Sequence, residues 1–106
     1  MDGERRRRLE AAGWKTGTVQ DFLGLSDAEV AYIDLKLSLG RTLRERRAAS
    51  GLTQTALAEK LGSSQSRVAK MEASDPSVSL DLLLRALLTL GATPGEIGEM
   101  IKLDAA

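Results

Sequence analysis

The sequence predicts an all-α fold of five helices, and three observations support this prediction. Aliphatic residues dominate the chain, which contains only three aromatic residues and two prolines, a composition that suits packed helices. Segments with the apolar spacing of helices are separated by glycines and short polar loops. Serine or threonine precedes these segments at positions where a side-chain hydroxyl can cap a helix. The length of 106 residues suits one modest domain.

The chain begins with a polar segment, residues 1–17, which we expect to be a disordered basic tail. It carries four consecutive arginines, Arg5 to Arg8, and one tryptophan, Trp14. A buried anchor or a contact with a partner would each explain a tryptophan in such a segment, and the sequence does not decide between them.

A helical extension is expected over residues 18–38. Thr18 can cap a short turn that ends at Gly24. Ser26 and Glu29 then form the S-x-x-E pattern of a capping box, in which each side chain bonds the other residue's backbone N–H. A long helix is therefore predicted to begin there.

Two glycines punctuate the long helix, which is predicted to run toward Ser50. Gly40 either bends the helix or divides it in two, because glycine weakens a helix interior. Gly51 follows at the position just past the last turn, where glycine commonly ends a helix.

The stretch from Gln54 to Glu72 predicts two short helices joined by a tight turn. Thr53 can cap the first helix, whose apolar residues recur on one face. Gly62 follows at the position where a left-handed backbone costs glycine nothing. Ser64 can cap the second helix. These spacings are typical of a helix-turn-helix.

The second helix is predicted to span residues 65–73, with Val68 and Met71 facing inward. Its outer face carries amide, hydroxyl and amine groups, from Gln65, Ser66 and Lys70. Such a face suits a recognition helix that lies in the DNA major groove. A plain helical hairpin with a solvated face would share the apolar pattern, but it would not require the caps and the turn glycine at this spacing.

The charge distribution also favours nucleic acid as the partner, although the net charge is zero. Seven basic and three acidic residues lie between Arg41 and Glu72, whereas two basic and five acidic residues follow from Ala73 onward. The positive field is therefore concentrated in the helix-turn-helix, where DNA phosphates would lie. Arg5 to Arg8 either add phosphate or minor-groove contacts or belong to a solvated tail.

Two further helices are predicted after the second helix of this motif. Ser79 can cap a helix over residues 80–90, of which seven are leucine. No single face holds seven leucines, so we expect this helix to be buried nearly all round. Thr93 can cap a last helix from Pro94 to about Lys102.

The run GLTQTALAEKLGSSQSRVAKMEAS, residues 51–74, resembles the helix-turn-helix of phage-repressor-like regulators, the Xre family. The resemblance extends over about residues 39–90. It implies a phage-repressor-like DNA-binding domain at residues 39–92, followed by a C-terminal helix and tail at residues 93–106. Many relatives have glycine and asparagine after the glutamate, whereas residues 73–75 here read ASD. We therefore expect a different loop after the recognition helix.

Base contacts are expected from the outer face of the second helix. The Gln65 amide can donate to and accept from the major-groove edge of adenine, a bidentate pair worth about 1–3 kcal/mol of discrimination. The Ser66 hydroxyl can contact either base type, and the Lys70 amine can reach guanine or a phosphate. Phosphate contacts are expected from Gln54, Ser64 and Arg67.

The family resemblance adds two implications for this site. It implies the same DNA-contacting roles for Gln54, Gln65 and Ser66. It also implies that Arg47 pairs with Glu72 and thereby fixes the angle of the recognition helix. Two independent surface charges are the alternative for this pair.

The surplus of apolar residues predicts a homodimer. One recognition helix contacts only a few base pairs, whereas a dimer reads two half-sites about 34 Å apart on one face of DNA. We expect a twofold interface that includes the fourth or fifth helix, with contributions from Leu84, Leu88 and Ile97. In the alternative, the N-terminal extension covers the same leucines within one chain.

Composition argues against catalysis. The chain has no cysteine and no histidine, so thiolate metal sites and the commonest general base are missing. Its acids form no pair or cluster at a spacing suited to acid–base or metal chemistry, so we expect no enzyme activity, no metal and no cofactor. It also lacks an apolar run of about 18 residues. No membrane segment is therefore expected, and a cytoplasmic location is the default.

Two hypotheses about function remain. The first is a sequence-specific DNA-binding transcriptional regulator, a repressor that acts as a homodimer on a double-stranded operator. The second is an antitoxin that binds and neutralises a small ribonuclease-like toxin and represses its own operon. The long leading helix motivates the second hypothesis, because it resembles the antitoxin subgroup of the family. One chain can do both.

Overall fold

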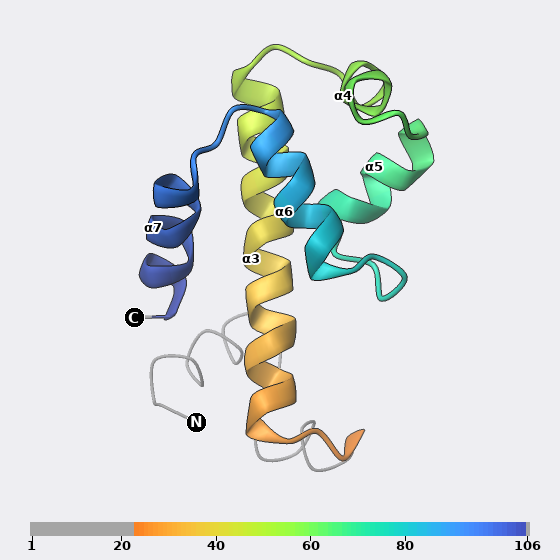
Figure 1. Cartoon of the computed structure of the whole chain (residues 1–106). Helices are drawn as coiled ribbons and strands as arrows, with labels where there is room; N and C mark the ends of the chain where they lie inside the picture. Colours follow the sequence, from red (N-terminus) through yellow and green to blue (C-terminus); the bar gives the residue numbers. More distant parts are fainter. Residues whose placement is uncertain (1–22, 106) are drawn as a thin grey trace.

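The computed structural model describes residues 23–105, and this part of the chain is all-α, with no strand (Figure 1). The helices are α3 (Asp27–Ala49), α4 (Gln54–Leu61), α5 (Gln65–Glu72), α6 (Leu80–Thr89) and α7 (Pro94–Ala105). The predicted all-α fold of five helices is confirmed. The expectations for the basic tail, for Arg5 to Arg8, for Trp14 and for the turn capped by Thr18 lie outside the described residues.

The helices begin where the sequence predicts, because side-chain groups bond their first backbone N–H groups. Ser26 and Glu29 form both bonds of the capping box, at 3.1 Å each, and start α3. Single hydroxyl caps start α4, α5 and α6, from Thr53, Ser64 and Ser79 respectively. A second capping box joins Thr93 and Glu96 at the start of α7, where the sequence predicted only the threonine cap.

The long helix α3 is unbroken, so the expectation that Gly40 would divide it is wrong. Gly40 lies where α3 crosses the C-terminal end of α5. A Cβ atom at this position would lie 2.9 Å from the carbonyl oxygen of Met71 and 3.0 Å from that of Glu72. The backbones therefore approach too closely for any side chain. This close packing explains a glycine that costs helix stability in isolation.

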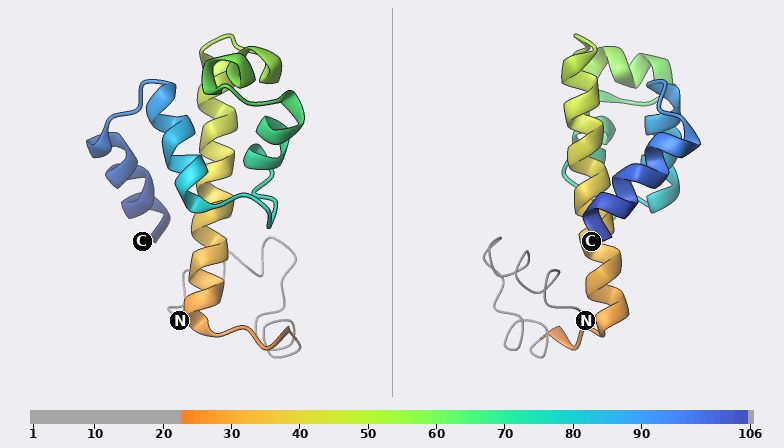
Figure 2. Two further views of the ribbon diagram at one scale, coloured as in Figure 1. Left: turned by 45° about the vertical axis from the view of Figure 1, so that its right-hand side comes forward. Right: turned by 90° about the vertical axis from the view of Figure 1, so that its left-hand side faces the viewer.

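The buried core is built around the C-terminal half of α3, from which Leu39 and Leu43 are almost fully buried. The later helices and loops supply the other core residues, which are Leu57, Ala58, Val68, Met71, Val78, Leu83, Ala86, Leu87, Ala92 and Ile97. Helices α5 and α7 lie on opposite sides of α3 (Figures 1 and 2). The N-terminal half of α3 extends beyond the other helices (Figure 2).

Helix α6 is buried on one side only, so the expectation that it would be buried nearly all round is wrong. Its buried residues are Leu83, Ala86 and Leu87. The opposite face carries an ion pair between Asp81 and Arg85 at 2.9 Å, and both side chains are exposed. Leu88 is 46% exposed on this helix. The two charged residues keep one face of α6 in water. Leucines occupy more than the buried face of the helix, so some of them, such as Leu88, are left exposed.

Candidate nucleic-acid interface

Backbone hydrogen bonds fix the turn between α4 and α5. Gly62 adopts the left-handed conformation, with φ of 65°, and the Ser63 N–H donates to the carbonyl oxygen of Ala58 at 2.8 Å. The hydroxyl of Ser64 then accepts a hydrogen bond from the Arg67 N–H at 3.2 Å. Helix α4 therefore ends and α5 begins at the predicted residues, which determines the angle between the two helices.

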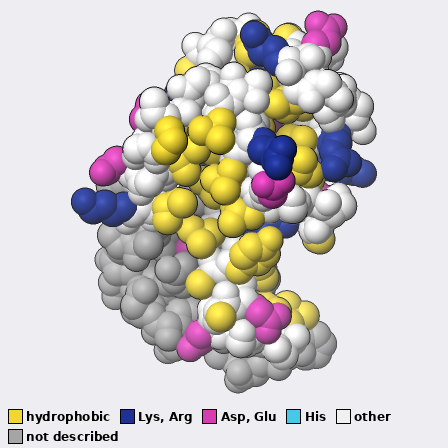
Figure 3. Space-filling model, viewed as in Figure 1, with side chains coloured by type: hydrophobic (Ala, Val, Ile, Leu, Met, Phe, Trp, Pro, Cys, Tyr) yellow, Lys and Arg dark blue, Asp and Glu magenta, His cyan; other side chains and the backbone are white. Residues whose placement is uncertain are grey.

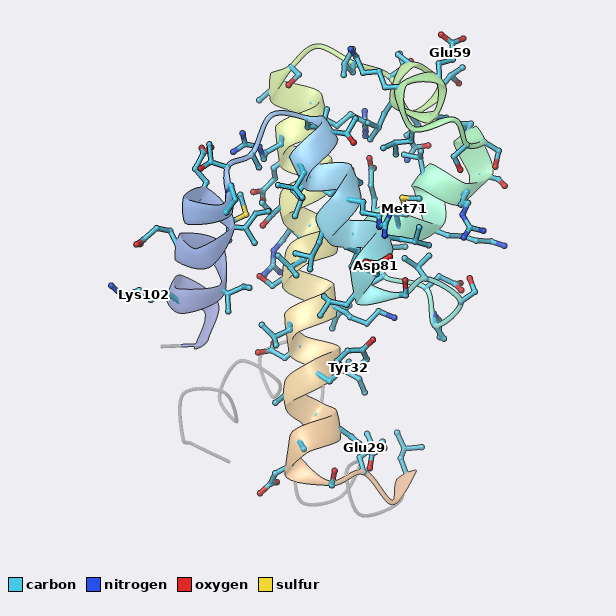
Figure 4. The ribbon with its side chains drawn as sticks, in the orientation of Figure 1. Glu29, Tyr32, Glu59, Met71, Asp81 and Lys102 are labelled. Carbon is cyan, nitrogen blue, oxygen red and sulfur yellow. The ribbon has the colours of Figure 1, made fainter. Side chains whose placement is uncertain are left out.

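One face of α5 is packed into the core. Val68 is fully buried and Met71 nearly so, and Met71 lies on the side of α5 that faces α6 (Figure 4). The facing residues of α4 are Leu57 and Ala58, both buried. Because alanine is small, α4 and α5 can cross closely. The apolar contacts thereby hold the opposite face of α5 toward solvent.

The predicted base-contacting residues lie on that outer side of α5, where Gln65, Ser66 and Lys70 are all exposed. Arg67 is also exposed, one residue after Ser66, and Ser64 lies at the start of the helix. The Ser64 hydroxyl caps α5 as an acceptor, and it can still donate its own proton to a phosphate oxygen. The outer side of α5 thus presents one amide, hydroxyl groups and two cations.

The structure brings Arg47 and Glu72 together as an ion pair between the end of α3 and the end of α5. The Arg47 Nε donates to one carboxylate oxygen, and its Nη2 donates to the other at 3.0 Å. Its Nη1 donates to the carbonyl oxygen of Leu52 at 2.8 Å. The Glu72 side chain is only 5% exposed, so this bidentate contact compensates for its burial. The hydrogen bond from Glu72 raises the pKa of Arg47 above its ordinary value.

The Glu72 carboxylate also bonds the first residue of α4, and that residue bonds the first residue of α5. Gln54 Nε2 donates to Glu72 Oε1 at 3.1 Å, and Gln65 Nε2 donates to Gln54 Oε1 at 2.6 Å. A chain of four side chains therefore runs from α3 to the N-terminus of α5. Sequence reasoning named all four residues, but it missed the two glutamine contacts because nothing in the local pattern indicates them.

The loop after α5 contains a residue with an unusual backbone conformation. Ser74 adopts a left-handed conformation, with φ of 54°, which glycine and asparagine take more readily. Its hydroxyl donates to the carbonyl oxygen of Lys36 at 2.5 Å, which joins the loop to α3. Asp75 accepts hydrogen bonds from the backbone and hydroxyl of Ser77, and these bonds lower the pKa of Asp75. The loop is thus held by contacts of its own.

The charges around the motif are mostly basic where the structure describes them. Lys60, Arg67 and Lys70 are exposed on α4 and α5, whereas Glu72 is buried in its ion pair and Glu59 is exposed on α4. Within the described residues, no group of His, Cys, Asp or Glu side chains is arranged to hold a metal ion. No helix in this part of the chain is both long and apolar enough to cross a membrane.

The fold and the geometry of α4 and α5 define a helix-turn-helix protein, the class in which a second helix enters the DNA major groove. The chain belongs to a family described as "Helix-turn-helix domain". The model of this family matches residues 38–100. Comparison with curated proteins and with solved structures found no match.

Proposed function

We propose that this chain is a sequence-specific DNA-binding transcriptional repressor that acts as a homodimer, with α5 in the major groove. The observation that carries the proposal is the outer side of α5, which presents polar and cationic groups while its first side chain is held in place. Gln65 is bonded to Gln54, which is bonded in turn to Glu72. A side chain that is already oriented loses less conformational entropy when it binds a base.

The geometry leaves Gln65 able to pair with adenine. One hydrogen of its Nε2 is engaged with Gln54, while the second hydrogen and the carbonyl oxygen are the two groups that an adenine edge requires. Ser66 and Lys70 are exposed on the same helix and are proposed to contact bases. The proposed phosphate contacts are Gln54, Ser64 and Arg67.

The proposed dimer follows from the need to read two half-sites and from apolar side chains that the described chain leaves exposed. Leu88 of α6 is 46% exposed and Ile101 of α7 is partly exposed, whereas Leu84 is half-buried. Ile97, the third predicted contributor, is buried in the core of the same chain. Leu88 is therefore the strongest of the three candidates for the interface.

Selection from random double-stranded DNA tests sequence-specific DNA binding by the full chain directly. The full chain should enrich one sequence made of two inverted half-sites, and light scattering of the complex should give two chains per site. Leu88→Asp should lower the fraction of dimer while circular dichroism shows an unchanged helix content. Selection that enriches no sequence would remove the sequence-specific function, and a single half-site bound by one chain would remove the dimer.

A second function, that of an antitoxin, is supported by the surface of the N-terminal half of α3. Tyr32 is 45% exposed and Leu37 is 41% exposed, and both precede the matched residues 38–100. Exposed apolar side chains outside the DNA-binding motif suit a protein partner. The test is co-expression with the product of any adjacent reading frame that encodes a small basic protein. A stable complex with the wild type that is lost on Leu37→Glu supports the antitoxin, and the lack of a complex argues against it.

A further inference from the structure

A groove of about 630 Å³ lies between the α4–α5 turn, α5 and α6. Its apolar lining consists of Leu61, Leu82 and the exposed Leu88, with the almost fully buried Met71 and Ala86 behind them. In the space-filling view, hydrophobic side chains lie between basic ones over α5 and α6 (Figure 3). A concave surface of this size that combines apolar and charged side chains is typical of small-molecule sites, and the proposed base contacts Gln65, Ser66 and Lys70 do not line it.

Three cations surround this apolar lining, one from each helix that borders the groove. They are Lys60 of α4, Arg67 of α5 and Arg85 of α6. Arg85 is paired with Asp81, but both side chains are largely exposed, and such a pair is weak in water. An incoming anion can therefore compete for Arg85. The groove thus combines an apolar interior with a positive rim.

We infer that this groove binds an amphipathic organic anion, a small molecule with an acidic head and an apolar body. The head would lie among the three cations, and the body would cover the apolar lining. The turn residues Gly62 and Ser63 also border the groove. The three cations favour an anionic occupant, and a volume of about 630 Å³ lies in the range of small-molecule sites.

A bound anion would also regulate DNA binding, and this second half of the inference rests on the proposed function. Arg67 borders the groove and is one of the three proposed phosphate contacts. A ligand head that neutralises Arg67 would remove one phosphate contact from each subunit. Each lost contact lowers both the affinity for DNA and its dependence on salt. The ligand would therefore release the repressor from its operator.

The binding half is tested on the full chain without DNA, by titration of ¹⁵N-labelled protein with sodium decanoate below its micelle threshold and with 8-anilinonaphthalene-1-sulfonate. We expect saturable shifts at the amides of Gly62, Ser63 and Thr89. Acetate, which lacks the body, and decyltrimethylammonium, which has the opposite charge, should leave these amides unchanged. Arg85→Glu should weaken anion binding at least tenfold, whereas Arg41→Glu, an exposed arginine of α3, should not.

Three results would overturn the binding half. The first is that neither anionic probe shifts the groove amides. The second is that the cationic probe shifts them as much as the anions do. The third is that Arg85→Glu and Arg41→Glu weaken anion binding to the same extent. Leu88 lines the groove and is also the strongest candidate for the dimer interface. Groove amides that move with protein concentration alone, and not with either anion, would therefore assign this surface to the dimer and overturn the anion site.

The regulatory half is tested by measuring operator affinity with and without decanoate. The wild type should lose affinity as decanoate approaches saturation, while Arg85→Glu should bind the operator normally and respond much less. A ligand that binds the groove and leaves operator affinity unchanged would overturn the regulation alone. A chain that binds the anion but no DNA would overturn the proposed function and leave the groove assignment standing.

Discussion

The two halves of α3 belong to one unbroken helix but lie in different environments. The C-terminal half is buried through Leu39, Leu43 and Gly40, and Arg47 joins it to α5. The N-terminal half extends beyond the other helices (Figure 1). It buries Val30 and Lys36 but exposes Tyr32 and Leu37. The exposed half is the more apolar of the two, with seven apolar residues at positions 27–38 against four at positions 39–49. Hydrophobicity alone therefore does not distinguish a packed segment from a surface open to a partner.

The difference teaches which contacts hold the motif in place. Buried and half-buried contacts such as Arg47–Glu72 fix the C-terminal half, whereas exposed ion pairs such as Arg46–Glu96 add little. Substitution of a buried residue should therefore change the unfolding free energy more than substitution of an exposed residue close to it in the chain.

The largest effect is expected at the ion pair between α3 and α5. Arg47→Met removes three hydrogen bonds and leaves the buried Glu72 carboxylate without its cation, which should cost about 3–5 kcal/mol of unfolding free energy. Arg46→Met is the matched control, because Arg46 pairs with Glu96 at 3.4 Å on the surface. That loss should stay below about 1 kcal/mol. Urea denaturation of both variants measures the difference, and equal losses would refute it.

Gly40 offers the next contrast. Gly40→Ala places a methyl group within 3.0 Å of two carbonyl oxygens of α5, and the overpacking should cost about 1–3 kcal/mol despite the better helix propensity of alanine. Gly98 of α7 has no neighbouring atom within 4 Å of an added Cβ. Gly98→Ala should therefore stabilise the chain by about 0.5–1 kcal/mol. Opposite signs in thermal unfolding support the close approach, and two stabilising substitutions would contradict it.

The sequence predicted what local chemistry determines. Caps at Ser26, Thr53, Ser64 and Ser79 and the left-handed Gly62 each depend on residues within one helical turn, and the structure has all of them. The start of every described helix follows from such short-range rules.

The sequence did not predict contacts between residues far apart in the chain. Gly40 was expected to bend or divide the helix, and its close packing was missed because the carbonyl groups it meets lie more than thirty residues away. Ile97 was expected on a surface, yet it is buried in the core of its own chain. The contact of Gln54 with Gln65 also depends on how α4 packs on α5. Tertiary packing, which no local pattern contains, decides each of these cases.

A smaller effect is expected on the outer side of α5. Gln65→Ala should cost about 1–3 kcal/mol against the preferred base at one position of the operator, with little change in stability because the side chain is exposed. Arg67→Ala should instead weaken binding to all sequences and reduce the salt slope by about one unit. Fluorescence anisotropy on single-base operator variants at several salt concentrations separates the two patterns. Unchanged base preference in Gln65→Ala would show that α5 does not read bases.

The smallest effect on stability is expected at Leu37, in the exposed half of α3. Leu37→Ala should change the unfolding free energy by no more than about 0.5 kcal/mol, because the side chain is 41% exposed. Leu39→Ala, two residues along the same helix, should cost about 2–5 kcal/mol, because Leu39 is almost fully buried. Operator affinity should survive Leu37→Ala, since the residue precedes the helix-turn-helix. If Leu37→Ala destabilises the chain as much as Leu39→Ala does, this half of α3 serves the fold and offers no surface to a partner.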